Sequence, residues 1–320
     1  MVMKRTCALL LICVAAYAGL SGGCANQRGG GGTTTRGAPY TGPTLSMPEL
    51  AQQINARNER LPTLWAKHYY EATIVDEKKQ SHFVNGDGAL LFKRPLGMRL
   101  VGNKPVAGRV FEIGSTDENY WLTVNTPDLS QMWWGKYEHL GKPCVRPVPI
   151  RPDQVFEVLG VSTFNTDLTA LPAPTLRFNN DFDAYMVVWI SRMPDRYAAV
   201  KEVWYDRQTL LPTLVLLFDA SGRVQLRAKL ANHQPVEVPD TPPGQWPKVA
   251  TSYKLYFPET GTKMSFELSD MVLCNNGVPC RRGIMFPGAT REDAGVDKVT
   301  QLDEDCDKPP TPGAPAASGR

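Results

Sequence analysis

The sequence has little net charge and, beyond its N-terminal apolar segment, none of the common catalytic motifs. Its 320 residues include 35 Lys and Arg against 32 Asp and Glu, which gives a formal net charge of +3. A nearly neutral chain lacks the excess of basic residues that binds a phosphate backbone, so we expect no nucleic acid as partner. HExxH, Walker A and GxGxxG patterns are absent, and the single GxSxG match, at residues 19–23, lies in the N-terminal apolar segment. We therefore expect no catalytic residues and no cofactor, which favours a protein that is not an enzyme.

Residues that commonly bind metals are also sparse. No CxxC pair occurs, and the four histidines are isolated along the chain, so we predict no metal site. An acidic run, Asp303 to Asp305 with Asp307, is not part of a spaced acidic loop, and we expect a solvated strand end there. His68 interrupts an apolar alternation. This favours a buried histidine, or one at a pocket mouth, over a catalytic one.

Long apolar runs are confined to the N-terminus. Residues 1–23 begin with Lys4 and Arg5 and continue with a short apolar run, which predicts a signal peptide rather than a membrane-spanning helix. Small residues directly before Cys24 resemble a bacterial lipobox, whose cysteine becomes lipidated with acyl chains such as palmitate. Leu20 lies four residues before Cys24, whereas the best lipoboxes have Leu three residues before it. Ordinary secretion, with Cys24 incidental, is therefore the alternative.

A flexible segment follows the predicted anchor. Residues 24–44 contain runs of Gly and Thr that have nothing to bury, and we interpret them as a tether. Ala25, in place of aspartate, resembles the enteric-bacterial pattern for sorting to the outer membrane. We therefore expect a cell-envelope protein anchored on the periplasmic side of the outer membrane. The folded domain is expected over residues 45–307, followed by a disordered tail at 308–320.

The cysteine count suggests disulfides. Of seven cysteines, two lie in the signal peptide and Cys24 is the predicted anchor, which leaves four. In an oxidising compartment four cysteines can pair in three ways. Cys274 and Cys280 flank an Asn-Gly turn, so we predict a bridge between them. Cys144 and Cys306 would then pair by elimination.

Two short helices are predicted. Ser46 is a suitable N-cap, Pro48 lies in the first turn and Glu49 completes a capping box, so a helix of about three turns should start there and end near Asn58. Residues 151–160 have a proline near their start and a glycine at their end, which predicts a second helix.

Most of the remaining chain alternates apolar with polar residues, which predicts about ten to twelve antiparallel strands. The glycines in Asn85–Gly88 predict a bulge or bend. Trp133 and Trp134 are neighbours and cannot both face inward, so we expect one on the exposed face or at a rim. The residues expected on the apolar strand faces are Leu64, Ala66, Tyr70, Ala72 and Ile74; Phe182, Ala184, Met186, Val188 and Ile190; Leu214, Leu216 and Phe218; Val224, Leu226, Ala228 and Leu230; Tyr253, Leu255 and Phe257; and Met264, Phe266, Leu268 and Val272.

So many half-buried strands need one apolar interior. We predict a mainly β fold, in which a single curved antiparallel sheet forms an unclosed β-barrel and the short helices act as plug or lid. Two short helices cannot fill such an interior unless the sheet closes tightly. An apolar pocket open at one end is therefore expected.

The order of these elements resembles the bacterial lipoprotein-localisation family, which includes the carrier LolA, the receptor LolB and related lipoproteins. The resemblance covers about residues 45–305 and implies a half-barrel with a helical lid over a cavity for the acyl chains of a lipoprotein. No residue that contacts the ligand in that family is assigned to a position in this sequence. The predicted lipid anchor makes this chain more similar to the receptor LolB than to the soluble carrier LolA. The matching segments are residues 50–58, 61–66, 86–95, 111–115, 120–122, 133–137, 151–153, 211–214, 219–222 and 253–256.

We therefore expect a lipid-anchored protein that binds lipid or lipoprotein acyl chains and takes part in sorting lipoproteins to the outer membrane, with an envelope protein as a further partner. Two alternatives stay open. One is a non-catalytic scaffold lipoprotein with a filled core, and a cavity of roughly 300 Å³ or more would argue against it. The other is an envelope enzyme acting on glycan, which paired carboxylates ~5–9 Å apart in a cleft would support.

Overall fold

The computed structural model describes residues 42–307, apart from residues 76–78, 80, 106–107, 128, 141, 143, 147–149, 180 and 275–282 and the side chain of Ile74. The chain from Tyr40 onward is one compact unit. The predicted signal peptide, Cys24 and the tail at 308–320 lie outside the described residues, so the predictions about them stay predictions. Among the described residues, no helix is both long and apolar enough to cross a membrane.

Strands dominate the described chain. The helices are α2 (Met47–Asn58), α3 (Pro152–Leu159) and the short α4 (Arg291–Ala294). The strands are β1 (Thr63–Val75), β2 (Ser81–Lys93), β3 (Gly97–Lys104), β4 (Gly108–Ser115), β5 (Asn119–Thr126), β6 (Leu129–Lys136), β7 (Ala173–Asn179), β8 (Ala184–Arg192), β9 (Tyr197–Asp206), β10 (Pro212–Phe218), β11 (Val224–Ala231), β12 (Gln234–Pro235), β13 (Lys248–Val249), β14 (Ser252–Phe257), β15 (Thr262–Val272) and β16 (Lys298–Gln301).

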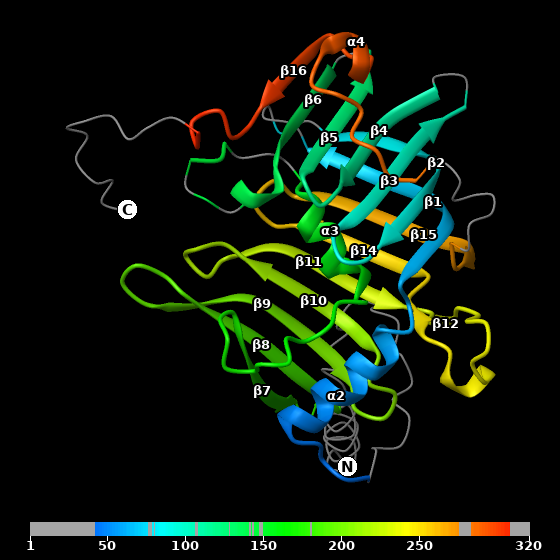
Figure 1. Ribbon diagram of the computed structural model, residues 1–320, viewed down its shortest axis with the longest axis vertical. Coiled ribbons are helices and arrows are strands. Elements are labelled where there is room, and N and C mark those ends of the chain that lie inside the picture. The colour runs from blue at the N-terminus through cyan, green and yellow to red at the C-terminus, as the bar shows by residue number, and fades with distance from the viewer. Residues whose placement is uncertain are drawn as a thin grey trace, which may run out of the picture. The chain divides into compact units, whose positions relative to one another are not determined.

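Fourteen of these strands form one sheet, in the order β16-β6-β5-β4-β3-β2-β1-β15-β14-β11-β10-β9-β8-β7. Each neighbouring pair is antiparallel except β16, which runs parallel to β6. The end strands β16 and β7 do not pair with each other, so the sheet curves without closing (Figure 1). This confirms the predicted unclosed, mainly β fold. The sheet has more strands than expected because β7 and β16 lack a clear apolar alternation.

Both predicted helices are confirmed. The backbone N–H and the hydroxyl of Ser46 donate to Glu49 Oε2, at 2.8 and 2.7 Å, and α2 buries Leu50 and Ile54 completely. α3 ends at Gly160, whose φ of 70° is in the left-handed region that favours glycine. Figure 1 shows α3 between the two halves of the sheet and α2 beside β7 to β10.

The predicted inward faces are confirmed for most of β1, β11, β14 and β15 but wrong for β8 and β10. Tyr185, Val187 and Trp189 of β8 are buried, and the buried residues of β10 include Val215 and Leu217. The other predicted residues of these two strands, apart from the buried Ala184, are half-buried on the outward face, and Phe182, which precedes β8, is exposed. Both faces of these two strands are apolar, so alternation of hydrophobicity could not select the inward one.

Asn85–Gly88 forms no bulge, contrary to the prediction. β2 pairs with β1 in unbroken register, with Gly86 opposite Tyr70 and Gly88 opposite His68. A Cβ at Gly88 would overlap the His68 ring, and the same holds for Gly102 with Phe111 and for Gly114 with Trp121. These glycines therefore leave room for a ring on the neighbouring strand instead of bending their own strand.

Trp133 and Trp134 point to opposite faces, as alternation requires, and both are half-buried. Trp133 packs against the main inward core. Trp134 belongs to a second cluster on the outward face, where it contacts Phe286 at a ring distance of 5.3 Å. The residues around 284–299 cover this face. One tryptophan is therefore on the outward face, as expected, but a segment far along the sequence covers it in part.

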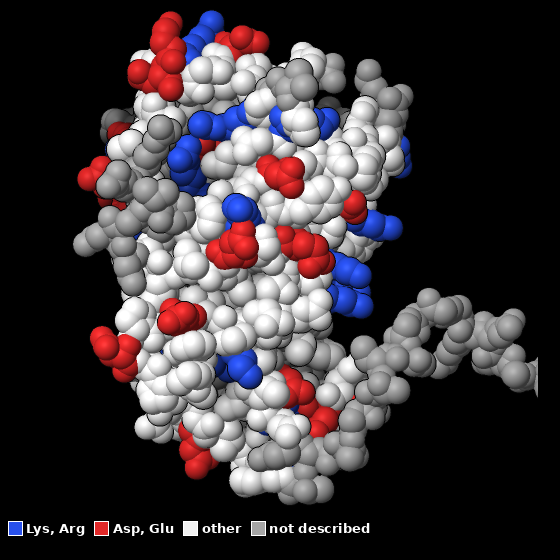
Figure 2. All heavy atoms as spheres, turned by 90° about the vertical axis from the view of Figure 1, so that its right-hand side faces the viewer, with Lys and Arg blue, Asp and Glu red and all other residues white. Residues whose placement is uncertain are grey.

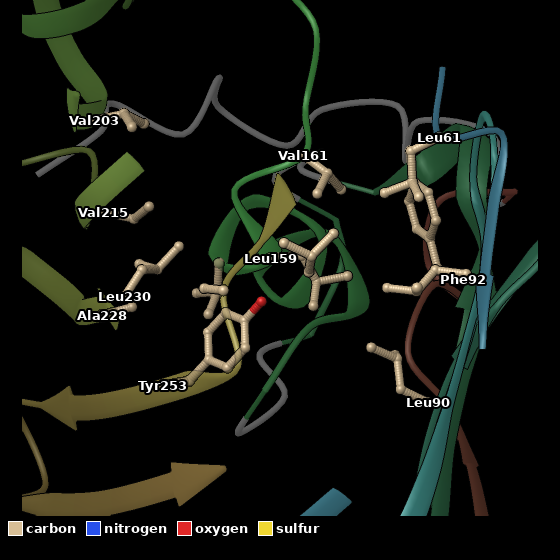
Figure 3. Close-up of a cluster of buried hydrophobic side chains, with 14 of the residues drawn as sticks. Leu61, Leu90, Phe92, Leu159, Val161, Val203, Val215, Ala228, Leu230 and Tyr253 are labelled. Carbon is tan, nitrogen blue, oxygen red and sulfur yellow. The ribbon is translucent and has the colours of Figure 1, made fainter. Parts of the chain in front are cut away.

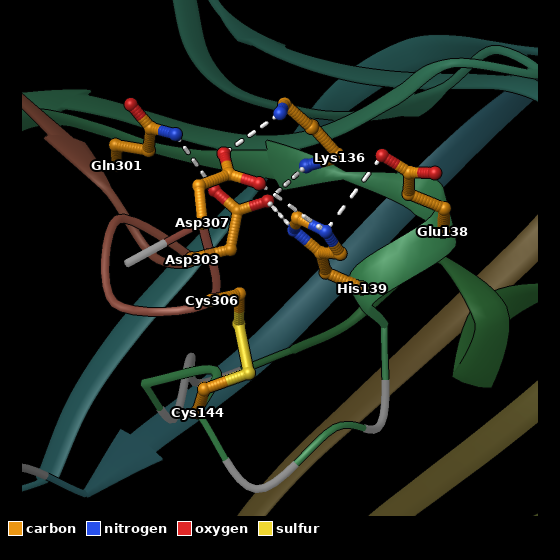
Figure 4. A network of polar contacts seen from close by, with 8 residues as sticks. All are labelled: Lys136, Glu138, His139, Cys144, Gln301, Asp303, Cys306 and Asp307. Atoms are coloured by element: carbon orange, nitrogen blue, oxygen red, sulfur yellow. Dashed lines mark hydrogen bonds and ion pairs between the residues drawn. A yellow bond between two sulfur atoms is a disulfide. The ribbon is translucent and has the colours of Figure 1, made fainter. Parts of the chain in front are cut away.

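The acidic run at 303–307 is solvated at Glu304, Asp305 and Asp307, as we had expected for a strand end, but not at Asp303. Asp303 is fully buried and accepts hydrogen bonds from the Lys136 N–H and from Gln301, at 2.8 and 2.9 Å (Figure 4). His139, predicted to be isolated, is buried with Nδ1 2.8 Å from Asp303 Oδ2. Burial opposes ionisation, but these hydrogen bonds lower the pKa of Asp303. Asp303 is buried because it pairs with Lys136 and His139, which are far away in the sequence, and the residues next to Asp303 give no sign of this pairing.

A disulfide joins Cys144 to Cys306 beside this network, as predicted, with their Cα atoms 5.2 Å apart (Figure 4). Cys280 lies outside the described residues, so its pairing with Cys274 stays a prediction. The backbone N–H of Cys274 donates to Thr63 Oγ1 at 3.0 Å, which joins the end of β15 to the start of β1. The Cys144–Cys306 bridge and the Asp303 network together fasten the C-terminal segment to β6. We name this arrangement the C-terminal clasp.

Replacing Cys144 and Cys306 with serine should lower the free energy of unfolding. The bridge closes a loop with a sequence separation of 162, and the chain-entropy model gives about 5 kcal/mol for a loop of that size. Denaturant unfolding of the oxidised wild type and the double variant measures the difference. The double variant treated with reductant is the control and should change little. Equal unfolding free energies for wild type and variant would show that the clasp does not depend on the bridge.

His68 should make the fold less stable in acid. Burial lowers its pKa from 6.5 to about 4, so stability is fully present above pH 6.5 and falls between 6.5 and about 4, where only the unfolded chain binds the proton. The loss amounts to about 3 kcal/mol. Chemical unfolding at a series of pH values would compare wild type with His68→Gln, whose curve should fall less by that amount. Parallel curves would contradict the assignment.

Candidate functional site

The inward side of the sheet encloses a small apolar cavity next to α3. Its volume is about 50 Å³. The wall combines β2 to β4 with β11, β14 and β15, and α3 with Ile150 covers it. The lining residues are Leu90, Leu100, Ile113, Ile150, Gln154, Val155, Val158, Leu159, Leu226, Tyr253, Leu255, Phe257, Met264, Phe266 and Leu268.

α3 is the element that fills the interior. Val155, Val158 and Leu159 recur at helical spacing, and all three line the cavity. Figure 3 shows Leu159 between Tyr253 on one side and Leu90 and Phe92 on the other. Apolar side chains from strands far apart in the sheet therefore meet at this one helix. The prediction of a helix that plugs a half-barrel is confirmed at α3.

One ion pair links α3 to β9. Lys201 Nζ lies 2.8 Å from Glu157 Oε2 and 4.1 Å from the centroid of the Trp189 ring. The hydroxyl of Ser162 also donates to Glu157, at 3.2 Å. Beyond these polar contacts, α3 is retained mainly by its apolar face. The segment that follows α3 is held more firmly, because Asn58 donates to the Ser162 carbonyl oxygen at 2.8 Å and Asn55 bonds to the backbone of Phe164.

Two buried polar atoms near the cavity have no hydrogen-bond partner among the described residues. One is the hydroxyl of Tyr253, which points into the apolar cluster in Figure 3 and whose pKa is raised by burial. The other is Nδ1 of His68, whose Nε2 lies 3.0 Å from the carbonyl oxygen of Val101. His68 is buried and its ring is 5.6 Å from that of Phe266, a cavity residue. The prediction that His68 is buried is therefore confirmed, and only one of its two ring nitrogens has a hydrogen-bond partner among the described residues.

The sequence-predicted site residues do not lie at this cavity. Cys24 and Cys280 are outside the described residues, and Cys144 and Cys306 form the C-terminal clasp. Among the described residues, no group of three or more His, Cys, Asp or Glu side chains is arranged to hold a metal ion. Sequence reasoning missed the pairing of Lys201 with Glu157, because these residues are 44 positions apart and neither belongs to a motif.

Comparison with known proteins gives similar structures but no similar sequences. No family model matches the sequence, and no curated protein matches it. A DUF1329 family protein from Desulfovibrio piger has a TM-score of 0.48 at 9% identity, covering 73% of this chain and 94% of that protein. A LolA superfamily protein from Nitrosomonas europaea has a TM-score of 0.45 at 14% identity, covering 72% and 96%.

A third similar structure is an outer-membrane lipoprotein-sorting protein domain from Vibrio parahaemolyticus. Its TM-score is 0.48 at 14% identity, and the match covers 74% of this chain and 95% of that domain. No functional residue is transferred at these identities. Two of these neighbours are named for the LolA superfamily or for lipoprotein sorting, as is the family that the sequence resembles, and the likeness concerns the fold alone.

Proposed function

We propose that this protein is a lipid-anchored component of the cell envelope that binds the acyl chains of a lipid or lipoprotein between the sheet and α3, without catalysing a reaction. The observation that carries the proposal is the apolar cavity under a helix with few polar attachments. Transfer of an acyl chain from water to such an apolar wall is favourable by about 25 cal/mol per Å² of apolar surface buried.

The cavity size determines how binding would occur. Sites for drug-sized ligands measure roughly 300–1,000 Å³, whereas this cavity measures about 50 Å³. An acyl chain would therefore take the place of α3, whose apolar residues Val155, Val158 and Leu159 occupy the same interior. In this proposal the structure is the closed form. Separation of Lys201 from Glu157 would accompany opening.

The proposed location follows from the N-terminus. A lipidated Cys24 and a tether up to about residue 44 would hold the domain at the periplasmic side of the outer membrane. Lipoproteins in transit, or their acyl chains, would then be within reach, and an envelope protein would deliver or receive them. This is the basis for proposing a role in lipoprotein sorting.

The small cavity also favours a second candidate, a scaffold lipoprotein whose core is filled and whose surface binds envelope partners. Such a protein would bind no acyl chain under any condition. An enzyme acting on glycan is not favoured in the same way, because the residues that line the cavity include no carboxylate.

Leu100→Trp should reduce acyl binding, because Leu100 lines the cavity and a larger side chain fills it. The chain from Tyr40 onward would be titrated with a fluorescent long-chain fatty acid, and co-purifying lipid identified by mass spectrometry. We expect affinity to fall at least about tenfold, in line with a cost of 1–3 kcal/mol for overpacking. Leu216→Trp is the matched control: Leu216 lies on the outward face of β10, and this variant should bind like wild type.

Melting temperatures of both variants show whether they are folded. If wild type carries no lipid and binds no fatty acid, the scaffold function replaces the proposal. If a folded Leu100→Trp protein binds as wild type does, the acyl site lies elsewhere.

Cys24→Ser should release the protein from membranes, because serine cannot carry the thioether-linked lipid. Cell fractionation with a salt wash, which screens electrostatic attraction, would compare the variant with wild type in the membrane pellet. Cys144→Ser, which removes a cysteine outside the predicted anchor, is the control and should remain membrane-bound. A Cys24→Ser protein that still sediments with membranes after the wash would overturn the anchor assignment.

A further inference from the structure

A larger hollow than the interior cavity lies on the opposite, outward side of the sheet. Its volume is about 500 Å³. Four cationic side chains line it: Arg227 and Lys229 of β11, Lys254 of β14 and Lys263 of β15. We name this hollow the cationic groove. Glu71 of β1 is the one carboxylate among its lining residues, and it accepts a hydrogen bond from the Tyr69 hydroxyl at 3.1 Å.

The strand register brings these cations together. Lys254 is directly opposite Lys229, and Tyr256 lies between Arg227 on one side and Lys263 on the other. Directly opposite side chains in a sheet have Cβ atoms about 5 Å apart, and like charges in such pairs destabilise the sheet. Among the described residues, none of the four cations forms an ion pair. The groove therefore keeps an uncompensated positive charge that an anion would neutralise.

The groove is bordered by apolar surface. Phe83 and Tyr256, both groove residues, have 63% and 37% of their surface exposed. Beyond β11, the residues opposite Arg227 and Lys229 are Leu216 and Leu214 of β10, on the same outward face. Cations next to exposed aromatic and aliphatic side chains are typical of surfaces that bind the headgroup region of a membrane.

The small net charge of the whole molecule gives no sign that four cations lie close together in the groove. The formal net charge is only +3. Figure 2, which draws one side of the molecule, shows that Lys and Arg side chains are spread unevenly over it, with several gathered in the upper part. Local charge, rather than net charge, determines attraction to an anionic surface over distances of about one Debye length.

We propose that the cationic groove binds the phosphate headgroups of anionic lipids and holds the outward face of β11, β14 and β15 against a membrane. Charge complementarity and the flanking Phe83 and Tyr256 support a bilayer as the occupant. The inward residues of the same strands line the interior cavity, so this contact would bring that cavity close to the membrane. The proposal does not depend on acyl binding in the interior.

The test uses the chain from Tyr40 onward, which is one compact unit and lacks Cys24. Flotation with vesicles of phosphatidylcholine, alone or with phosphatidylglycerol, measures binding at low and moderate salt. Wild type should bind only the vesicles with phosphatidylglycerol, and salt should weaken binding. Lys254→Glu should bind at least about tenfold more weakly, because it removes one cation and pairs with Lys229, and each cation near the surface contributes about 1 kcal/mol.

The same substitution separates lost binding from lost folding. Lys254→Glu replaces a like-charge pair by an opposite-charge pair, so its melting temperature should equal or exceed that of wild type. Lys298→Glu is the matched control, because it changes the net charge equally at an exposed position on β16. It should reduce vesicle binding less than about twofold, the effect expected of a cation far from the contact.

Three results would overturn the proposal. One is wild-type binding that does not distinguish the two kinds of vesicle, and another is equal losses for Lys254→Glu and Lys298→Glu. The third is a rise in melting temperature with inorganic pyrophosphate but no vesicle binding, which would assign the groove to a soluble anion. Leu100→Trp alters only the interior, so its effect on fatty-acid binding is independent of these results.

Discussion

Burial of one inward sheet face around α3 is the interaction on which the rest of the structure depends. The fourteen strands place their inward side chains toward a common interior, and an open sheet cannot bury that face by pairing its own ends. Val155, Val158 and Leu159 contact side chains from both halves and complete the core. Removing α3 without a replacement would expose an apolar surface to water. An acyl chain is a chemically suitable replacement, which is why the same helix is central to both stability and the proposed function.

An open sheet also needs support at its ends. At one end the short β16 runs parallel to β6, and the C-terminal clasp fixes it through Asp303, His139 and the Cys144–Cys306 bridge. The segment before β16 covers Trp121 and Trp134 on the outward face. Both faces of the sheet are therefore covered at this end, by the main core on the inward face and by a smaller cluster on the outward face. The remaining outward face, from β2 to β8, has no such cover in the described chain.

The two faces of β11, β14 and β15 have contrasting chemistry. Inward residues such as Leu226, Tyr253 and Phe266 are buried in an apolar wall, whereas the outward residues one position away include Arg227 and Lys254. Because alternate residues of a strand point to opposite faces, one short sequence can supply a wall for apolar chains and a surface for anions. The two proposed activities are thus separable by substitution yet physically adjacent.

The sequence by itself determined the local features, because capping, turn chemistry and period-two alternation depend on neighbouring residues. Ser46, Glu49 and Gly160 predicted helix ends, and the alternation predicted an open β sheet whose apolar interior the two short helices would plug or cover. The tertiary structure alone decided which face of β8 and β10 is buried, since both are apolar. It also decided that Asp303 and Trp134 are covered, that Lys201 reaches Glu157, and that four cations converge on one groove. Each of these depends on strand order and register between distant segments, which the period of a single strand does not encode.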